Sequence, residues 1–358
     1  MSLEYQKIAV VLFNLGGPDK LSSIRPFLYN LFRDYHIIRI NFFLRNLFAF
    51  LISFFRYKKI RSSYALMGDG SPLLRETENQ AKILEQRLNS DSKKVIFKVF
   101  ISMRYWHPFS NETVRNIKKF LPNEILCLPL YPHFSTATTL SSIRDFKKSL
   151  KKNSCNIVTK SFCCYYNQED FLRSHVNLLK NTLDSLGNFQ NYVLIFSAHS
   201  LPQKFIDSGD PYQWQIEESV KNIIQKLNKD GYKIREKDWE ISYQSKIGPI
   251  KWLKPSTVEV IENHARNMQN IILIPISFVS EHIEVLVELD IEYKEVADRY
   301  NVEFIRISTL RLEKSFIEAL YKNVINMFLN QDSQKITSSN LQKNCPPKFS
   351  SCLYGKSL

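Results

Sequence analysis

Residues 271–292, IILIPISFVSEHIEVLVELDIE, are the most informative stretch, because an apolar run passes directly into an acidic segment. The run at 271–277 has the length and aliphatic content of a buried strand. In the segment that follows, Glu284, Glu288 and Glu292 recur at every fourth position. That spacing puts three carboxylates on one face of a helix, so the stretch predicts a strand followed by a helix.

The acidic segment carries more negative charge than a helix of this length needs. Residues 281–292 hold five acids and His282, and no basic residue appears before Lys294. Like charges four positions apart repel one another, so the stripe and its histidine indicate a site for cations or protons. Alternatively, acids near a helix N-terminus complement the helix dipole. That interpretation accounts for Glu281 and leaves Glu288 unexplained.

The rest of the chain alternates strand-like runs with longer amphipathic segments. The runs are 7–13, 95–102, 124–130, 156–162, 192–197, 239–243, 271–277 and 302–307. The helix-like segments include 73–88, 112–120, 171–186, 213–228, 256–270 and 310–329, and Ser256 with Glu259 forms a capping box. This alternation predicts an α/β fold with parallel sheets, divided into two similar doubly wound halves of four strands each.

The expected domain boundaries follow from this division. The N-terminal half is 1–163 and includes a lip at 37–59; the C-terminal half is 164–312; a helix at 313–330 packs back on the body; and 331–358 is a polar tail. His199 and Glu284 both fall in the C-terminal half.

Composition limits the function classes. The 358 residues are 44% hydrophobic with a formal net charge of +14, which alone would allow nucleic acid or an anionic membrane as partner. The lysines are spread along the chain rather than gathered into arms, so we expect no nucleic-acid binding. Six cysteines without a CxxC pair, and no secretory signal peptide before the first strand, indicate a reducing cytoplasmic compartment.

The lip contains the closest approach to a membrane segment. Its longest uncharged run, 46–55, has ten residues, about half of the roughly 20 that span a bilayer. Phe and Leu interrupted by Arg39, Arg45 and Arg56 suit a helix at a membrane interface or the rim of an apolar pocket. An ordinary buried helix is the structural alternative.

Ligands of open α/β sheets bind at the carboxyl ends of the strands, so the residues that follow each predicted strand are candidate binding residues. The first strand is followed by the turn that begins Asn14-Leu15-Gly16-Gly17. Arg104 and Tyr105 follow the second strand, Ser135 lies in a hydroxyl-rich segment after the third, and His199 follows the fifth.

Several enzyme classes are excluded by these sequences. The chain lacks GxGxxG after its first strand, GxSxG around Ser200, and HExxH near His282. The aromatics, hydroxyls and few cations suit a large flat apolar ligand with anionic groups. A histidine and a carboxylate add ligands for a divalent ion such as Fe(II), or acceptors for protons.

Seven motifs in order resemble ferrochelatase: LFNLGGPD, GSPLLRETENQA, SMRYWHP, LPLYPHFSTATT, FSAHSLP, YQSKIGPIKWLKPST and FVSEHIEVLVELDIEY. The resemblance covers residues 7–312. It implies a chelatase fold of two Rossmann-like domains, each a four-stranded parallel sheet flanked by helices. The implied activity is that of a lyase that inserts Fe(II) into protoporphyrin IX in haem biosynthesis, with release of two protons.

The resemblance also assigns residues. His199 in SAHSLP and Glu284 in SEHIE face each other across the ring as catalytic and metal-binding pair, with the roles of base and ligand left open. The residues implied for a proton or metal path are His282, Glu288, Glu292 and Glu281. Those implied for porphyrin binding are Leu15, Arg104, Tyr105 and Trp252, with Ser71 and Ser135 as carboxylate contacts.

No resident cofactor is expected. Some ferrochelatases hold a [2Fe–2S] cluster with four cysteines, three of them in the C-terminal tail, whereas this tail has only Cys345 and Cys352. The expected partners are porphyrin and Fe2+, with a monomeric cytoplasmic protein touching the inner membrane peripherally. A non-catalytic haem or metal carrier on the same fold, and a chelatase for another tetrapyrrole or metal, are the alternatives.

Overall fold

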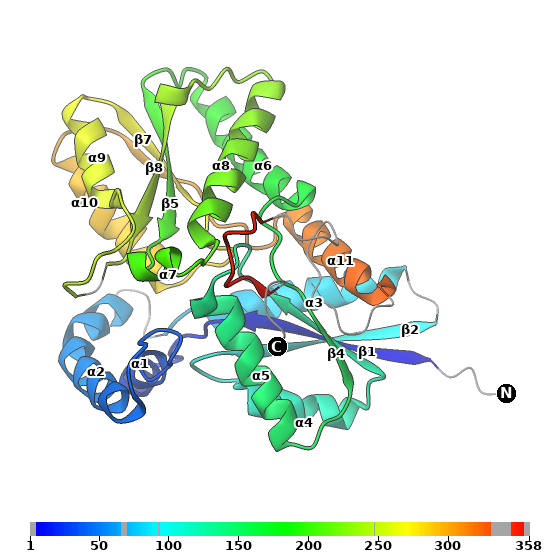
Figure 1. The fold of residues 1–358 in the computed structure, drawn as a ribbon. Coiled ribbons are helices and arrows are strands. Elements are labelled where there is room, and N and C mark those ends of the chain that lie inside the picture. The colour runs from blue at the N-terminus through cyan, green and yellow to red at the C-terminus, as the bar shows by residue number, and fades with distance from the viewer. Residues whose placement is uncertain (1–4, 66–69, 92–93, 247, 331–344, 354–358) are drawn as a thin grey trace. The chain divides into compact units, whose positions relative to one another are not determined.

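The computed structural model describes residues 5–65, 70–91, 94–246, 248–330 and 345–353, without the side chains of Lys59, Ala65 and Glu284. The chain divides into two compact units (Figure 1). Unit 1 comprises Met1–Cys164, Leu320–Asn344 and Leu353–Leu358, and unit 2 comprises Tyr165–Ala319 and Cys345–Cys352. The C-terminal helix α11 (Lys314–Leu329) begins in unit 2 and ends in unit 1.

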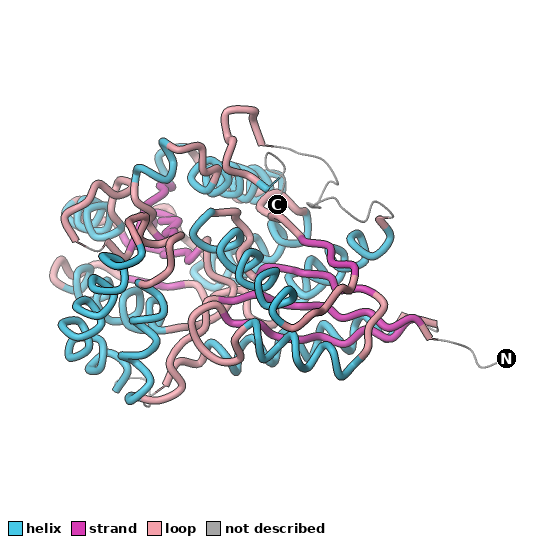
Figure 2. The backbone as a smooth tube through the Cα atoms, turned by 60° about the horizontal axis from the view of Figure 1, so that its bottom comes forward, coloured by secondary structure: helices cyan, strands magenta, loops and turns pink. Residues whose placement is uncertain are grey.

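Unit 1 is built on a parallel sheet in the order β2-β1-β3-β4. Its strands are β1 (Gln6–Asn14), β2 (Val95–Met103), β3 (Glu124–Pro129) and β4 (Val158–Ser161). Its helices are α1 (Ile24–Phe32), α2 (Phe42–Ala65), α3 (Leu73–Ser90), α4 (Ser110–Phe120) and α5 (Ser141–Lys152), with the 3-10 helix η1 (Leu21–Ser23) and the π-helix η2 (Thr136–Leu140). Figure 2 shows these strands side by side, with helices on both faces. Burial on both faces explains why β1 is a continuous aliphatic run.

Unit 2 repeats the arrangement with the order β6-β5-β7-β8. Its strands are β5 (Tyr192–His199), β6 (Trp239–Gln244), β7 (Asn270–Pro275) and β8 (Phe304–Arg306). Its helices are α6 (Glu169–Leu186), α7 (Gln203–Asp207), α8 (Tyr212–Lys229), α9 (Thr257–Arg266) and α10 (Tyr293–Asp298), with the 3-10 helix η3 (Glu236–Asp238) and the π-helix η4 (Glu284–Glu292). The predicted α/β fold of two four-stranded parallel sheets is therefore confirmed, as is the Ser256 capping box at the start of α9.

The strand order reverses between β1 and β3 in unit 1, and between β5 and β7 in unit 2. Crossovers leave in opposite directions on either side of such a point, which opens a crevice at the carboxyl ends of the strands. In unit 2, His199 ends β5 and the acidic segment follows β7. The topology therefore brings the predicted histidine and the predicted acids to the same edge of one sheet.

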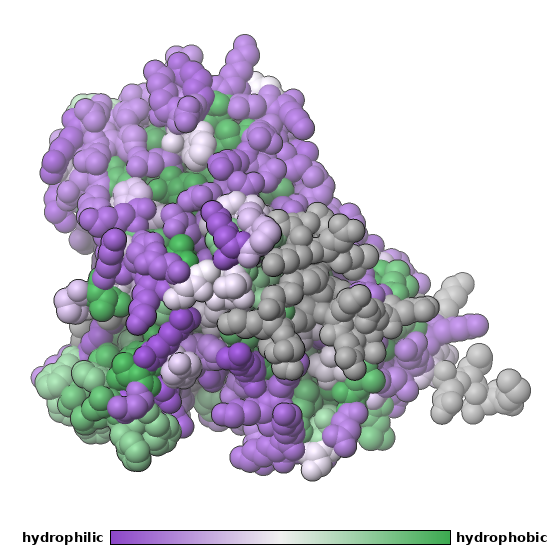
Figure 3. All heavy atoms as spheres, viewed as in Figure 1, coloured by the Kyte–Doolittle hydropathy of each residue, from purple (hydrophilic) through white to green (hydrophobic). Residues whose placement is uncertain are grey.

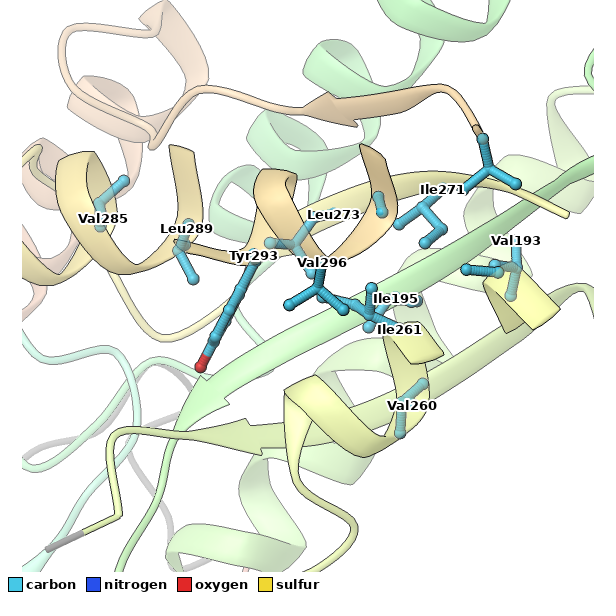
Figure 4. Close-up of a cluster of buried hydrophobic side chains, with 13 residues drawn as sticks. Val193, Ile195, Val260, Ile261, Ile271, Leu273, Val285, Leu289, Tyr293 and Val296 are labelled. Carbon is cyan, nitrogen blue, oxygen red and sulfur yellow. The ribbon is translucent and has the colours of Figure 1, made fainter. Parts of the chain in front are cut away.

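The core of unit 2 fixes the acidic segment onto the sheet (Figure 4). Val285, Leu289 and Tyr293 are buried and share a cluster with Ile195 of β5 and Leu273 of β7. Burying one such aliphatic side chain contributes about 1.5–3 kcal/mol. This apolar stripe is offset by one residue from the acidic stripe, so its packing on the sheet turns the acidic stripe away from this cluster.

The structure differs from the sequence-based expectation in several parts of the chain. The lip helix begins at Phe42 rather than at Ile37 and continues to Ala65, because residues 33–41 form the connection from α1. α5 begins in a Ser/Thr-rich segment that has weak helical propensity and was not predicted as a helix.

The predicted polar tail contains a packed segment, Cys345–Cys352, that belongs to unit 2. Gln215 donates to Cys345 Sγ at 3.2 Å, and the ring of Phe349 lies 5.5 Å from that of Trp214. Residues 331–344 and 354–358 of that tail lie outside the described part of the chain.

Candidate active site

His199 is held by its backbone at the carboxyl edge of unit 2. Its N–H donates to Ser277 Oγ at 3.0 Å, just beyond the end of β7, and its carbonyl accepts from Tyr212 OH at 3.0 Å. The side chain is half-buried. Fixing the main chain from both sides limits where the imidazole can lie, which is what a proton acceptor or metal ligand requires.

An aromatic ring connects the two predicted histidines. The ring centroid of Phe278 lies 6.3 Å from that of His199 and 4.5 Å from that of His282. His282 is buried and comes two residues before η4 begins. Unit 2 thus brings His199 and His282 to either side of one apolar side chain, directly before Glu284.

Glu284 begins the segment that was predicted as an α-helix, and the structure makes it a π-helix, η4. A π-helix has i→i+5 hydrogen bonds and widens the turn, and such segments are frequent at functional sites. Hydrophobic spacing alone does not distinguish the two helix types, which is why the sequence missed it. The side chain of Glu284 lies outside the described residues, so its place opposite His199 stays a prediction.

Glu288 is anchored by three hydrogen bonds. Ser245 donates through its N–H to Oε1 at 2.9 Å and through its hydroxyl to Oε2 at 2.5 Å, and Tyr293 OH donates to Oε1 at 2.5 Å. Ser245 follows β6, so this carboxylate ties η4 to the neighbouring strand end. Glu292, the last residue of η4, is exposed. The predicted path residues thus run from a fixed carboxylate to a solvated one.

The acidic segment is partly neutralised, which corrects the expectation of an uncompensated stripe. Arg306 of β8 donates to both carboxylate oxygens of Asp290 at 2.5 and 2.6 Å, and to Glu281 Oε1 at 2.9 Å. Burial alone would lower the pKa of Arg306, but Asp290 and Glu281 raise it above its usual value. Glu281 also accepts from the N–H and hydroxyl of Thr309 at 3.0 and 3.1 Å. This network makes Glu281 an anchor of the segment, and its place on a proton or metal path stays a prediction.

Trp252 is placed beside the His199 loop. It forms an antiparallel bridge with Pro202, and the Leu253 N–H donates to the Leu201 carbonyl at 3.0 Å. The indole is half-buried. The predicted ring-binding aromatic of unit 2 is therefore joined by backbone pairing to the loop that starts at His199.

In unit 1, Leu15, Arg104 and Tyr105 lie together at the carboxyl ends of β1 and β2. The Arg104 N–H donates to the Asn14 carbonyl and the Tyr105 N–H to the Leu15 carbonyl, both at 2.9 Å. Leu15 and Arg104 are half-buried, whereas Tyr105 is fully buried. The pairing of two predicted strand ends thus assembles three of the predicted porphyrin contacts.

Asp34, which the sequence did not single out, organises this end of unit 1. Its carboxylate accepts from Arg104 Nη2 at 2.9 Å, from Tyr105 OH at 2.8 Å, and from the hydroxyl of Ser141. Burial alone would raise the pKa of Asp34, but the Arg104 charge and the hydrogen bonds hold it below its usual value. The carboxylate is therefore ionised at neutral pH.

Ser71 and Ser135, the predicted carboxylate contacts, have structural hydrogen bonds. The hydroxyl of Ser71 accepts from the Leu73 N–H at 3.3 Å, next to Gly17, where an added Cβ would come within 2.6 Å of the serine. Ser135 is fully buried and its hydroxyl accepts from the Ala137 N–H at 3.1 Å, capping η2. These bonds fix the start of α3 and the loop after β3, and contact with a ligand stays a prediction for both.

The described part of the chain contains no group of three or more His, Cys, Asp or Glu side chains placed to hold a metal ion. Four supporting residues were missed by sequence reasoning: Asp34, Tyr212, Ser277 and Arg306. Only Ser277, the polar last residue of the predicted strand 271–277, carried a signal. The partners of the other three are far away in sequence, so no local pattern reveals them.

The fold is that of the chelatases. SirB from Bacillus subtilis with Fe3+ superposes with a TM-score of 0.53, covering 92% of this chain and 98% of that one at 9% identity. The sirohydrochlorin chelatase SirB from Bacillus subtilis subspecies spizizenii in complex with cobalt gives a TM-score of 0.52 with the same coverage and identity. At this identity the similarity shows the fold alone.

Sequence similarity identifies the family. The Ferrochelatase family model matches residues 7–327. The ferrochelatase of Rickettsia bellii (strain OSU 85-389) is 46% identical over 359 residues, or 99% of this chain and 96% of that protein. That of Pelagibacter ubique (strain HTCC1062) is 42% identical over 347 residues, or 97% of this chain and 98% of that protein. The chain belongs to the ferrochelatase family, whose members are lyases that insert iron into porphyrin in haem biosynthesis.

Proposed function

We propose that the protein inserts Fe(II) into protoporphyrin IX with His199 and Glu284 as the reacting pair. The placement of His199 carries this proposal. It ends β5 at the switch point, its main chain is fixed by Ser277 and Tyr212, and its ring contacts that of Phe278, which also contacts His282 two residues before Glu284. Two pyrrole N–H bonds break and two N–Fe bonds form, while two pyrrole nitrogens donate lone pairs. One neutral imidazole and one carboxylate suffice to accept the two protons or hold the incoming metal.

The acidic segment then removes the protons. Glu288 is fixed to Ser245 and Tyr293, and Glu292 is exposed at the end of η4. A proton that leaves the ring side thus finds successive carboxylates toward solvent. Arg306 compensates the charges of Asp290 and Glu281. Glu288 and Glu292 are the acids proposed to pass the protons on.

The reaction is tested anaerobically with purified protein, protoporphyrin and Fe(II), following the porphyrin absorption bands. We expect turnover by the wild type and a rate lower by about 10³-fold in His199→Ala. His264→Ala is the matched control, because His264 lies in the same unit, on α9, and its Nε2 bonds Glu240 of β6 at 3.0 Å rather than any residue proposed for the reaction. Ring binding without insertion by the wild type would instead identify a carrier, or an enzyme for another ring or metal.

The surface of α1 and α2 supports a peripheral membrane contact in the cytoplasm. Figure 3 shows apolar spheres gathered over these helices. Exposed apolar side chains on α2 are Phe42, Phe43, Leu44, Leu47, Phe48, Phe50, Leu51, Phe54 and Phe55. Neither helix contains an acid, and Arg25 lies over the rings of Phe50 and Phe54 at 5.2 and 5.1 Å. An exposed apolar patch with only basic charge suits an anionic bilayer surface.

In the described part of the chain, no helix combines the length and apolarity needed to cross a bilayer. The membrane contact is tested by cosedimentation with anionic and with zwitterionic liposomes. We expect binding to anionic liposomes at low salt that is lost in Phe43→Ser/Phe55→Ser, whose side chains are 84% and 73% exposed. Leu121→Ser, at 74% exposure elsewhere in unit 1, should bind like the wild type. Wild-type protein that ignores anionic liposomes would contradict the contact.

The remaining proposals concern composition and assembly. The protein works as a monomer and without a [2Fe–2S] cluster, which sedimentation and an assay of iron and labile sulfide in the isolated protein would test. Cys345 and Cys352 are both buried in the segment packed on unit 2. Stoichiometric iron and sulfide would contradict the absence of a cluster.

A further inference from the structure

Asp34 occupies a singular position in the sequence and in unit 1. Residues 21–68 contain eight Lys or Arg side chains and one acid, Asp34. That acid does not lie on the surface among these cations: it sits in the connection between α1 and α2 and is only 5% exposed. The one negative charge of a basic, apolar segment is therefore buried, which costs free energy unless specific partners compensate it.

The partners of Asp34 come from three places in unit 1. Its Oδ2 accepts from Arg104 Nη2 at 2.9 Å, from Tyr105 OH at 2.8 Å, and from the Ser141 hydroxyl. Its Oδ1 accepts from the His36 N–H at 2.9 Å. One carboxylate thus joins the α1–α2 connection to the end of β2 and to the first residue of α5.

Arg104 is oriented by the same network. Its Nε donates to Ser141 Oγ at 2.7 Å, and Nη1 lies 3.6 Å from Asp145 Oδ1. Asp34 and Ser141 therefore hold the guanidinium from two sides and also bond each other. A guanidinium has five N–H donors, so these contacts leave donors for a further acceptor.

We propose that Asp34 is a positioning residue for porphyrin binding: it fixes Arg104 so that the remaining donors meet a carboxylate of the ring. The inference rests on the proposed function, since it takes the ring as ligand of unit 1. Asp34 touches no reacting atom. Its effect is on ring affinity through Arg104, whereas the rate of metal insertion belongs to unit 2.

The decisive measurement is the porphyrin Kd, taken from fluorescence titration of the full chain, together with KM and kcat for Zn(II) insertion. In Asp34→Asn we expect Kd and KM to rise about tenfold, the loss typical of one charge-assisted hydrogen bond, with kcat changed less than about twofold. Asp91→Asn is the matched control, because Asp91 also accepts from an arginine, Arg87, and from a tyrosine, Tyr321 OH at 3.0 Å. It lies at the end of α3 and should leave Kd unchanged.

Two further comparisons separate positioning from a merely structural role. In an Arg104→Gln background, Asp34→Asn should change Kd by less than about twofold, because the guanidinium through which Asp34 is proposed to act is absent. With porphyrin dimethyl ester, which has no carboxylate, Asp34→Asn should bind like the wild type. Two results would overturn the proposal. One is a double variant whose Kd is raised by the product of the two single-variant effects, and the other is a raised Kd of Asp34→Asn for the ester.

Ser141→Ala covers the case in which Asp34→Asn does not fold. It removes the hydroxyl that bonds both Asp34 and Arg104 while keeping every charge, and should raise Kd about threefold for protoporphyrin and leave the ester unaffected. Unchanged Kd in this variant would overturn the proposal. Wild-type protein that binds the ring without inserting metal rejects the proposed function alone, because Kd still reports on Asp34.

Discussion

The two units carry sheets of the same strand order, yet the residues at their carboxyl edges differ in kind. Unit 1 presents Leu15, Arg104 and Tyr105, fixed by the buried carboxylate of Asp34. Unit 2 presents His199, held through its main chain by Ser277 and Tyr212, and the acidic segment, held by the partly buried cation Arg306. In each unit a charge thus holds groups of the opposite sign, since Asp34 holds Arg104 and Arg306 holds Glu281 and Asp290.

Under the proposed function, this difference assigns the carboxylate rim of the ring to unit 1 and the proton and metal chemistry to unit 2. The edge of unit 1 offers a cation with aromatic and apolar neighbours, which suits the anionic rim of an apolar ligand. None of these groups accepts a proton at neutral pH. An imidazole and carboxylates accept protons and ligate a divalent metal. Each sheet gathers side chains at the carboxyl ends of its own strands. Two copies of one architecture can therefore take on different tasks through the residues that follow each strand.

The largest effect is expected from removing Arg306, the partly buried cation of unit 2. Arg306→Ala leaves Glu281 buried beside Asp290 without compensation, so the free energy of unfolding should fall by about 3 kcal/mol. Urea titration measures this loss. Arg266→Ala, which removes an exposed partner of Glu262, should change it by less than about 0.5 kcal/mol. Equal losses in the two variants would remove the special role of Arg306.

A pH-dependent contrast comes from one histidine in each unit. Burial lowers the pKa of His175 in unit 2 from 6.5 to about 3. In unit 1, burial lowers the pKa of His36 to about 4, against the opposing effect of Asp34. The charges of Arg144, Arg104 and Arg39 contribute to this lowering. Between pH 6.5 and these values the unfolded chain binds protons that the folded chain does not. The free energy of unfolding should therefore fall as pH drops, by up to about 1.4 kcal/mol per pH unit for each histidine.

Substitution distinguishes the two contributions. His175→Phe and His36→Gln should each make the pH dependence of unfolding shallower between pH 6 and about 4.5. His264→Gln should not, because hydrogen bonding to Glu240 raises the pKa of His264 and gives it the opposite sign. An unaltered slope in His175→Phe would show that this histidine is protonated in the folded state.

A smaller effect is expected along the acidic segment. Glu288→Gln keeps the shape of the side chain but removes the charge that accepts from Ser245 and Tyr293, so kcat for metal insertion should fall about tenfold with unchanged ring affinity. Stopped-flow absorbance follows the reaction. Glu295→Gln, an exposed acid on α10, should behave like the wild type. If both variants turn over normally, the path does not run through Glu288.

Much of this arrangement could be predicted from the sequence. Buried parallel strands are long aliphatic runs, so the runs at 7–13 and 192–197 located β1 and β5, and with them the edges that carry Leu15 and His199. Family resemblance, rather than spacing, assigned the roles of single residues. Since the site residues follow strand ends, locating the strands located most of the site.

The rest depends on contacts between distant residues. Asp34 and Arg104 are bonded although they are 70 residues apart in the sequence, and Arg306 and Glu281 are 25 residues apart. Neither pair belongs to one periodic segment, so no hydrophobic or charge pattern indicates it. The π-helical form of η4 likewise depends on how Val285, Leu289 and Tyr293 pack on the sheet, because the same residues would also form an amphipathic α-helix.

The central claim is that Arg104 of unit 1 binds a carboxylate of the ring and that unit 2 carries out the insertion, and steady-state metal insertion by two variants tests it most directly. The account predicts that His199→Ala lowers kcat by about 10³-fold with ring Kd within about threefold of the wild type. It predicts that Arg104→Gln raises KM about tenfold with kcat within about threefold. A normal kcat in His199→Ala, or an equal loss of kcat in both variants, would contradict the division of labour.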